Sequence, residues 1–387
     1  MIPVKYNYRN LVVRKTTTIA AAFGLALVVF VFAAAQMLGN GIKRTLGRSA
    51  GAENAIILRR GSSSEMESGI EENQVNLVLA QAAQVGASKK QPGVGEVLVV
   101  ILMDKLGTTG VSNVTVRGVP EDVFEFRTSA KIVEGRAAKP GSDEVVVGSG
   151  IRGRFKGLEL GQSFDIKKNR PVKVVGVFAD DGSSFESEVW ADIHTARTAF
   201  GREGYVSSVR VRLDAASKFD AFKALVEQNR QLGLSVQREA DYYEKQSEAT
   251  SIFLTIMGTM IAVLFSIGAM IGATITMNAQ VANRQREIGT LRALGFSRRS
   301  ILTSFLLESI VLATIGGLVG AAASLGLSFV KITMLNAGTW SEIAFTFEPT
   351  PAIIIRSMVL AGFMGVVGGF LPAVRAARVS PIEAMRA

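Results

Sequence analysis

The sequence contains no cysteine and only one histidine, His194, among 387 residues. The absence of cysteine excludes disulfides, thiolate metal ligands and a cysteine nucleophile. A single histidine excludes a metal site built from several histidines, and we interpret His194 as a surface residue. The sequence also lacks the phosphate-binding pattern GxxxxGK followed by Ser or Thr, and the nucleophile pattern G-x-S-x-G. We interpret the acid pair Asp180-Asp181 as solvated surface. The sequence therefore predicts neither a catalytic site nor a metal site in this chain.

Long hydrophobic runs dominate what is present. Hydrophobic residues make up 48% of the chain and charged residues 20%, with a mean hydropathy of +0.30. Four stretches are nearly free of charge and long enough to cross a bilayer; they are Ile19–Leu38, Thr250–Met277, Ser309–Val330 and Ser357–Val374. The sequence predicts an α-helical membrane protein with four transmembrane helices.

The net charge of +10 is concentrated in three short segments. Residues 1–15 and 278–300 each carry +4, and residues 375–387 carry +2, whereas residues 39–249 are nearly neutral. Positive residues in short loops are retained on the cytoplasmic side of a membrane. The pattern therefore predicts cytoplasmic N and C termini and no nucleic-acid role. A cleaved signal peptide is the alternative interpretation of the N-terminus, although its apolar run exceeds the usual length.

The large hydrophilic insert, residues 39–249, shows a mixed α+β pattern. A strand–helix–strand pattern occurs at both of its ends, with strands expected near 54–60, 94–103, 111–119, 207–213 and 234–238, and helices near 70–85 and 218–230. Strand and turn signals dominate 131–190. We predict a split α/β unit at about 44–125 plus 206–240 and a β-rich insertion at about 126–205.

The complete predicted organisation has nine segments. They are an N-terminal cytoplasmic segment (1–18), transmembrane helix 1 (19–38), the extracytoplasmic domain (39–249, including a helical stalk at 241–249), transmembrane helix 2 (250–277), a cytoplasmic segment (278–300), transmembrane helix 3 (301–330), an outer loop (331–350), transmembrane helix 4 (352–374) and a cytoplasmic tail (375–387).

Small residues and one acid mark the predicted membrane helices. Glycines spaced by four allow helices to approach closely, and three such pairs occur, at Gly268 and Gly272, Gly316 and Gly320, and Gly365 and Gly369. Glu308 lies inside the third apolar stretch, where an acid is costly unless it is paired. We interpret Glu308 as a partner of nearby arginines, with a transport pathway as the alternative.

The basic segment between the second and third predicted spans carries the most specific pattern. Gly295 is expected to end a helix there, and Ser297 to cap the next one. This helix could anchor to anionic lipids, or it could dock a cytoplasmic partner. The residues are Arg284-Gln285-Arg286-Glu287-Ile288-Gly289-Thr290-Leu291-Arg292-Ala293-Leu294-Gly295-Phe296, followed by Phe305-Leu306-Leu307-Glu308.

This segment resembles the MacB/FtsX family of ABC transporter permeases, also called the type VII or mechanotransmission group. The ending Pro372-Ala373-x-Arg375-Ala376-Ala377-x-x-x-Pro381-Ile382-Glu383-Ala384 and the runs Glu144–Gly148 and Val174–Val177 are also similar to that family. The resemblance covers essentially the whole chain.

The resemblance implies a permease subunit that is itself not an enzyme. ATP and Mg would be bound by a separate ABC ATPase subunit, because the chain begins only about 18 residues before its first span. The residues implied to couple to that ATPase are Arg284, Arg286, Glu287, Ile288, Gly289, Leu291, Arg292, Ala293, Leu294 and Gly295. It further implies a porter-like unit with a sabre-like insertion in the periplasm, a homodimer or a heterodimer with a paralogous permease, and a membrane-fusion adaptor, all at the bacterial inner membrane.

Three functions remain open from the sequence. The leading hypothesis is efflux or export with a periplasmic adaptor. Extraction of lipoproteins from the membrane is a second hypothesis, and FtsX-like regulation of cell-wall hydrolases is a third. The large size of the insert favours the first two.

Overall fold

The computed structural model describes residues 15–88, 91–229, 231–336 and 338–381. The predicted segment 1–18 and the end of the predicted tail, with Ile382, Glu383 and Ala384, lie wholly or largely outside these residues. The chain divides into two compact units. The helical unit comprises 1–40, 251–330 and 346–387, and the α/β unit comprises 41–250 and 331–345.

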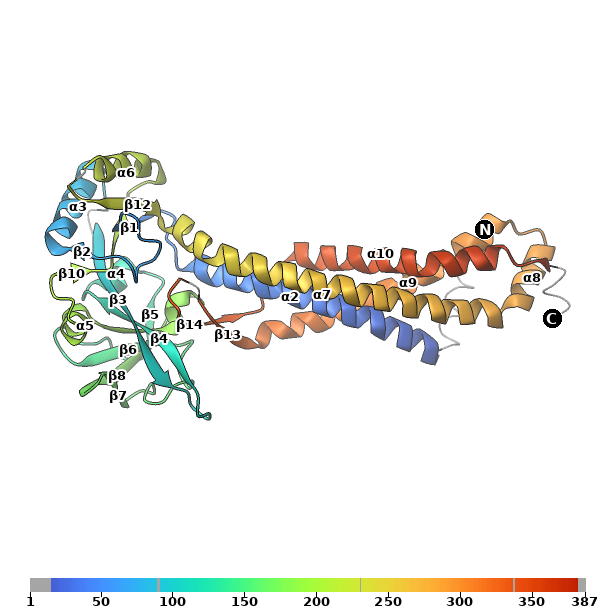
Figure 1. Ribbon diagram of the computed structural model, residues 1–387, viewed down its shortest axis with the longest axis horizontal. Coiled ribbons are helices and arrows are strands. Elements are labelled where there is room, and N and C mark those ends of the chain that lie inside the picture. Colours follow the sequence, from blue (N-terminus) through green and yellow to red (C-terminus); the bar gives the residue numbers. More distant parts are fainter. Residues whose placement is uncertain (1–14, 89–90, 230, 337, 382–387) are drawn as a thin grey trace. The chain divides into compact units, whose positions relative to one another are not determined.

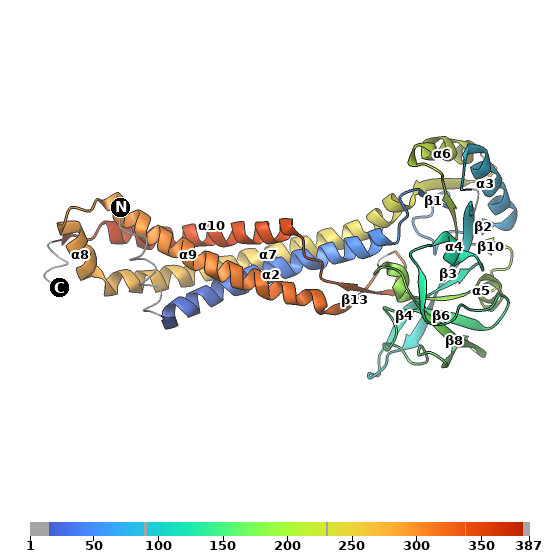
Figure 2. The same ribbon diagram turned by 180° about the vertical axis from the view of Figure 1, so that it is seen from behind.

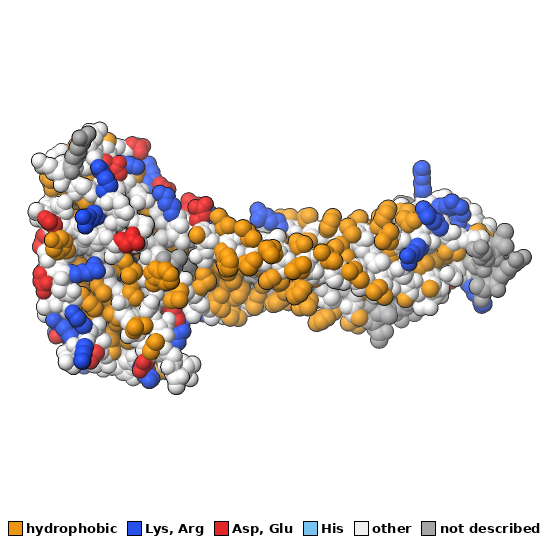
Figure 3. Space-filling model, in the orientation of Figure 1, with side chains coloured by type: hydrophobic (Ala, Val, Ile, Leu, Met, Phe, Trp, Pro, Cys, Tyr) orange, Lys and Arg blue, Asp and Glu red, His pale blue; other side chains and the backbone are white. Residues whose placement is uncertain are grey.

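Four helices in the described residues are long and apolar enough to cross a membrane. They are α2 (Lys15–Arg48), α7 (Glu239–Asn283), α9 (Arg298–Leu325, extended by the 3-10 turn η3, Gly326–Phe329) and α10 (Pro351–Ala377). Hydrophobic side chains cover the visible face of these helices (Figure 3). Phe23, Ile275 and Phe363, for example, are 59–68% exposed. Exposed apolar surface of this extent fits a lipid environment.

Local sequence explains where these helices begin. Ser297 precedes α9 and its side chain accepts a hydrogen bond from the Ser300 backbone N–H. Thr350 does the same for the Ile353 N–H at the start of α10, where Pro351 occupies the first turn. Such caps satisfy donors that have no partner within the helix, and proline is tolerated in this turn.

A ten-stranded sheet forms the centre of the α/β unit, in the order β12-β1-β11-β3-β4-β9-β6-β8-β5, with β7 also paired to β8. The strands are β1 (Asn54–Arg59), β3 (Gly93–Asp104), β4 (Val111–Val119), β5 (Lys131–Gly135), β6 (Glu144–Gly148), β7 (Ser163–Lys167), β8 (Arg170–Ala179), β9 (Glu188–Asp192), β11 (Ser208–Arg212) and β12 (Leu234–Arg238). A separate short pair joins β2 (Ile70–Glu71) to β10 (Tyr205–Val206). The β4–β9 and β6–β8 pairs are parallel, and the other pairs in the large sheet are antiparallel.

Helices α3 (Glu72–Val85), α5 (Ile193–Phe200) and α6 (Phe219–Gln228) complete this unit together with the short α4 (Val123–Phe126) and the 3-10 turns η1 (Ser184–Ser187) and η2 (Ala216–Lys218). Figures 1 and 2 show α3 and α6 beside the β1–β12 end of the sheet. Asp192 precedes α5 and caps it by accepting from the His194 and Thr195 N–H groups. His194 thus contributes a backbone donor at a helix start.

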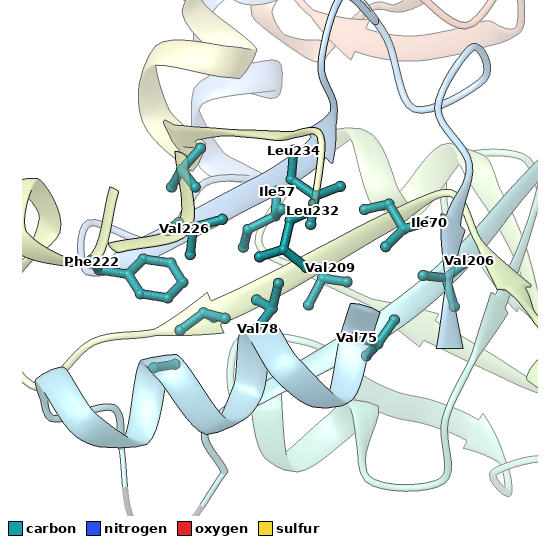
Figure 4. Close-up of a cluster of buried hydrophobic side chains, with 14 of the residues drawn as sticks. Ile57, Ile70, Val75, Val78, Val206, Val209, Phe222, Val226, Leu232 and Leu234 are labelled. Carbon is teal, nitrogen blue, oxygen red and sulfur yellow. The ribbon is translucent and has the colours of Figure 1, made fainter. Parts of the chain in front are cut away.

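Two clusters of buried apolar side chains lie along the large sheet. One lies around β1, β11 and β12 and packs against α3 and α6 through residues such as Val78, Phe222 and Val226 (Figure 4). The other lies around β4, β6, β8 and β9. Both clusters share one continuous sheet, because β3 and β4 pair over eight positions. These two clusters therefore lie on one sheet.

The segment between α9 and α10 contains a β-hairpin, although the sequence predicted only a loop over 331–350. Its strands are β13 (Lys331–Leu335) and β14 (Glu342–Thr346), which form a two-stranded sheet of their own. Short strands without strong alternation are difficult to distinguish from a loop in the sequence. Residues 331–345 belong to the α/β unit.

Candidate coupling segment and buried charge cluster

The basic segment folds as a short helix, α8 (Gln285–Ala293), which follows α7 after a single residue, Arg284. Gly295 follows α8 with φ +95°, a conformation that glycine adopts without the strain a side chain would add. The segment therefore turns sharply between α8 and α9, and both ends of α8 are held by long helices.

Only part of the predicted coupling set is available to a partner. Arg286, Glu287, Ala293, Leu294 and Gly295 are exposed, and Leu294 is 73% exposed. Figure 3 shows Lys and Arg side chains gathered at the α8 end of the helical unit. Leu294 is thus the most exposed large apolar side chain of the segment 284–296.

The remaining predicted coupling residues lie within the helical unit. Ile288 is 2% exposed and packs in an apolar cluster with residues of α7, α9 and α10, with Leu291 partly buried against it. Gly289 is also buried, and Arg292 is half-buried. Ile288 is therefore not on the exposed face of α8, because the helix directs this side chain toward the other helices.

A buried ion pair connects α8 to α9. The Arg284 guanidinium lies 3.2 Å from the Glu308 carboxylate, and both side chains are about 5% exposed. Arg284 also lies over the Phe305 ring, at 5.2 Å from its centroid, and forms a second ion pair with Glu287. The predicted arginine partner of Glu308 is therefore Arg284, and the pair fixes the start of α8 on α9.

The predicted glycine pairs differ in their surroundings. A Cβ atom added to Gly316 would lie 2.7 Å from the carbonyl oxygen of Ala22 in α2. A Cβ atom added to Gly320 would overlap the carbonyl oxygen of Ala26 in the same helix. Gly365 and Gly369 lie in the same way against α9. Nothing among the described residues lies within 4 Å of such a Cβ at Gly268 or Gly272, so within one chain these two do not serve close helix packing.

A cluster of seven buried charged side chains lies in the α/β unit, and the sequence had not revealed it. Its members come from the loop after β1, from strands β3, β4, β9 and β11, from the segment after α4 and from the first residue of α7. They are Arg117, Arg127, Arg210, Glu65, Glu96, Glu188 and Glu239, all at most 8% exposed. Four carboxylates face three guanidinium groups, so nearly every charge has an opposite charge beside it.

Short, bidentate contacts hold the cluster together. Arg117 donates to both oxygens of Glu188 at 2.7 Å and to Glu96 at 2.8 Å. Arg210 donates to Glu96 at 2.5 Å and to Glu239 at 2.7 Å. Guanidinium groups suit such contacts because their donors are fixed in a planar fork. The Phe185 ring lies beside the guanidinium groups of the three arginines, and its centroid is nearest to that of Arg127, at 3.9 Å from the Cζ atom.

Burial raises the pKa of a carboxyl group, and pairing with arginine lowers it. Burial alone would raise the pKa of Glu96, but the charges of Arg127, Arg210 and Arg117 lower it to about 2. Arg117 and Arg210 likewise hold the pKa of Glu65 well below its usual range against the effect of burial. Glu65 and Glu96 are therefore ionised at neutral pH.

The cluster fixes the N-terminal end of α7. Glu239 is fully buried and accepts hydrogen bonds from the Gly51 N–H at 2.9 Å, from Asn54 at 2.8 Å and from Arg210. Tyr243, one turn along α7, interacts with Arg210 through its hydroxyl at 3.1 Å. A negative side chain is favourable in the first turn of a helix.

One further acid of this region corrects the sequence interpretation. Asp180, predicted as solvated surface, is only 2% exposed and accepts a hydrogen bond from the Ser183 hydroxyl. Its neighbour Asp181 adopts a positive φ of 49° in the turn. The pair therefore shapes the loop before η1.

Family models match both halves of the chain. Residues 16–229 match a MacB-like periplasmic core domain, and residues 259–381 match an FtsX-like permease C-terminal domain. The chain belongs to the MacB/FtsX family of permeases. The ABC transporter permease predicted from the coupling motif is therefore confirmed at the level of the family.

Curated relatives of this MacB/FtsX permease are named as macrolide export ATP-binding/permease proteins. MacB 2 of Yersinia pestis bv. Antiqua (strain Antiqua) is 30% identical over 56% of this chain and 32% of its own. MacB of Burkholderia pseudomallei (strain 1710b) is 29% identical over 70% of this chain and 43% of its own. The chain thus spans less than half the length of these relatives.

Among solved structures, the periplasmic region of MacB from Actinobacillus actinomycetemcomitans matches 52% of this MacB/FtsX permease and 95% of its own chain, with a TM-score of 0.38 and 14% identity. The extracellular domain of the transporter YknZ from Gram-positive bacteria matches 48% of this chain and 99% of its own, with a TM-score of 0.36 and 18% identity.

Proposed function

We propose that this chain is the membrane subunit of an ABC transporter in which a separate ATPase subunit supplies ATP hydrolysis. The exposed part of α8 receives the ATPase, and α7 carries the resulting motion to the periplasmic α/β unit for efflux or export. The observation that supports this most directly is the extent of α7. It is one helix of 45 residues, it begins in the buried charge cluster, and one residue separates it from α8.

The proposed orientation places α8 and both termini in the cytoplasm and the α/β unit in the periplasm. The arginines of the α8 segment and the near neutrality of residues 39–249 support it. The proposed site is the bacterial inner membrane. We further propose a dimer, either of this chain or with a paralogous permease, that works with a membrane-fusion adaptor, and a periplasmic domain with a porter-like unit and a sabre-like insertion.

Docking of the ATPase at α8 is tested by copurification. Leu294→Asp should abolish recovery of the ATPase in detergent, because the proposed contact would bury an unpaired charge at the most exposed apolar side chain of the segment. Leu294→Met is the matched control and should retain the complex. Glu287→Lys combined with Ile288→Asp should also abolish the complex, but burial of Ile288 means that this pair disturbs the helical unit as well. Copurification of Leu294→Asp at the wild-type level would contradict docking at α8.

Transmission through α7 is tested by a flexible insert near Glu248. Six residues of Gly-Ser should leave ATPase binding intact while uncoupling ATP hydrolysis from transport. A matched insert of six residues in the exposed β3–β4 turn, after Thr108, should leave both unchanged. Transport at the wild-type rate with the α7 insert would rule out rigid transmission through this helix.

A further inference from the structure

The β13–β14 hairpin connects the α/β unit to a second pair of membrane helices. Only Val330 separates β13 from η3 at the end of α9, and four residues separate β14 from α10. The hairpin nevertheless belongs to the α/β unit. Any force on the hairpin therefore acts on the chain of α9 and α10 as well.

Hydrogen bonds attach one side of the hairpin to the sheet. The Thr115 hydroxyl of β4 lies 2.7 Å from the Ser341 hydroxyl, and both residues are buried. The Asn113 side chain donates to the Trp340 carbonyl at 2.6 Å. The Ala344 N–H donates to the Ser187 hydroxyl of η1 at 2.9 Å. The attachment thus joins the hairpin to strand β4 and to the turn η1.

A buried acid strengthens this attachment. Glu342 forms ion pairs with Lys105 at the end of β3 and with Arg154, and its side chain is only 7% exposed. Burial would raise the pKa of Glu342, but hydrogen bonds from Lys105 and Ser112 and the charge of Arg154 lower it. The carboxylate is therefore ionised at neutral pH, and removing it would leave two cationic groups without this partner.

The other side of the hairpin contacts the ends of α2 and α7 that belong to the same unit. Phe345 is 5% exposed and lines a small pocket together with Ile42 of α2 and Thr250 of α7. Asn336 donates to Gln246 of α7 at 3.4 Å. The hairpin is thus packed between the sheet on one side and α2 and α7 on the other.

We infer that the β13–β14 hairpin is a second mechanical attachment, which couples α9 and α10 to the periplasmic sheet, with Glu342 as its main positioning residue. This inference rests on the proposed function, in which the sheet is moved from the membrane. It adds α9 and α10 to the helices that move the sheet, whereas the proposed function assigned this motion to α7. The hairpin remains docked on β4 through the whole ATP cycle.

Docking through the cycle is tested with one engineered cysteine pair, Thr115→Cys with Ser341→Cys. The natural chain has no cysteine, so this pair can form only one disulfide within a chain, and the side-chain oxygens that the sulfurs replace lie 2.7 Å apart. Oxidation should give the same yield of intramolecular disulfide without nucleotide, with ATP and with ADP-vanadate in the ATPase complex. Each single-cysteine variant is the control for bonds between chains. A yield that falls severalfold in one nucleotide state would overturn permanent docking.

Mechanical coupling is tested by spin labels on Thr108→Cys in the β3–β4 turn and Phe329→Cys at the end of α9. The distance distribution between the labels should be narrow in the full chain in nanodiscs. Gly-Ser inserts on both sides of the hairpin, before Lys331 and after Thr346, should broaden it at least twofold. An unchanged distribution with these inserts would overturn the second attachment.

The role of Glu342 is tested with the same two labels. Glu342→Lys should broaden the distribution while the melting temperature shows that the unit still folds. Glu159→Lys, which reverses an acid in an exposed ion pair with Arg152, is the matched control and should not broaden it. A distance distribution in Glu342→Lys as narrow as that of the wild type would show that Glu342 does not position the hairpin. The two spin-label measurements need no ATPase, so failure of the proposed function, seen in the copurification experiment, remains distinguishable from failure of this inference.

Discussion

Replacing Arg210 by methionine should be among the most destabilising single changes in the α/β unit. The guanidinium is fully buried and bonds to Glu65, Glu96 and Glu239. Methionine is shorter than arginine but is unbranched and fills much of the space, so the main loss is electrostatic. Three buried carboxylates lose a shared cation, and the formal charge of the cluster changes from −1 to −2.

The size of the effect follows from what is left uncompensated. Breaking a buried ion pair by removing one partner costs about 3–5 kcal/mol. For a unit of 150–250 residues, 1 kcal/mol corresponds to about 2–4 °C in Tm. The expected decrease in Tm is therefore on the order of 6–20 °C. Partial protonation of Glu65 or Glu96 in the variant would bring the decrease in Tm toward the lower end of this range.

Thermal unfolding of the full chain in detergent, followed by circular dichroism, measures this effect. Arg152→Met is the matched control, since Arg152 also contacts two glutamates, Glu134 and Glu159, but at the surface. Exposed pairs contribute little to stability, so the control should melt close to the wild type. A Tm for Arg210→Met within 2 °C of the wild type would refute the reasoning that the cluster is desolvated and coupled.

Three further predictions concern pH, helix packing and the α8 contact. Because the pKa of Glu96 is lowered to about 2 from 4.5, its contribution to stability is complete above pH 4.5 and is lost as the pH falls toward 2; Tm measured against pH should be flat from 7 to 5 and fall below 4.5. Gly320→Ala should destabilise the helical unit by about 1–3 kcal/mol, because its Cβ would overlap α2. Gly362→Ala should not destabilise it, because nothing described lies within 4 Å of a Cβ at Gly362. Melting curves in detergent measure both effects. Glu308→Gln should weaken ATPase copurification severalfold more than Glu287→Gln, because only Glu308 is buried with its arginine.

The sequence was informative where one physical signal dominated. Four apolar runs indicated the membrane helices, the motif of residues 284–296 carried the resemblance to the family, and alternating residues such as those of 111–119 indicated strands. The turn at Gly295 and the cap at Ser297 could also be read locally, because both depend on single residues and their neighbours.

The charge cluster was missed because its signal is not local. Arg117 and Arg210 sit in strands that alternate apolar and polar residues, and an outward, solvated arginine gives the same pattern. Only the pairing of β11 with β3, and of β3 with β4, brings them to the same carboxylates. The burial of Ile288 was missed for a related reason, since the face of a nine-residue helix is decided by what packs against it.

The two buried charge groups near the ends of α7 suggest how a long helix could transmit motion. Buried ion pairs add little net stability, but breaking one is expensive, so they act mainly by fixing geometry. Glu239 fixes the first turn of α7 to β11 and to the loop that follows α2, and Arg284 fixes the residue after α7 to α9. A helix that could slip at either end would lose displacement there. Because slipping at either end would leave a buried charge unpaired, the two charge groups favour the proposed transmission along α7 over loss of displacement at its ends.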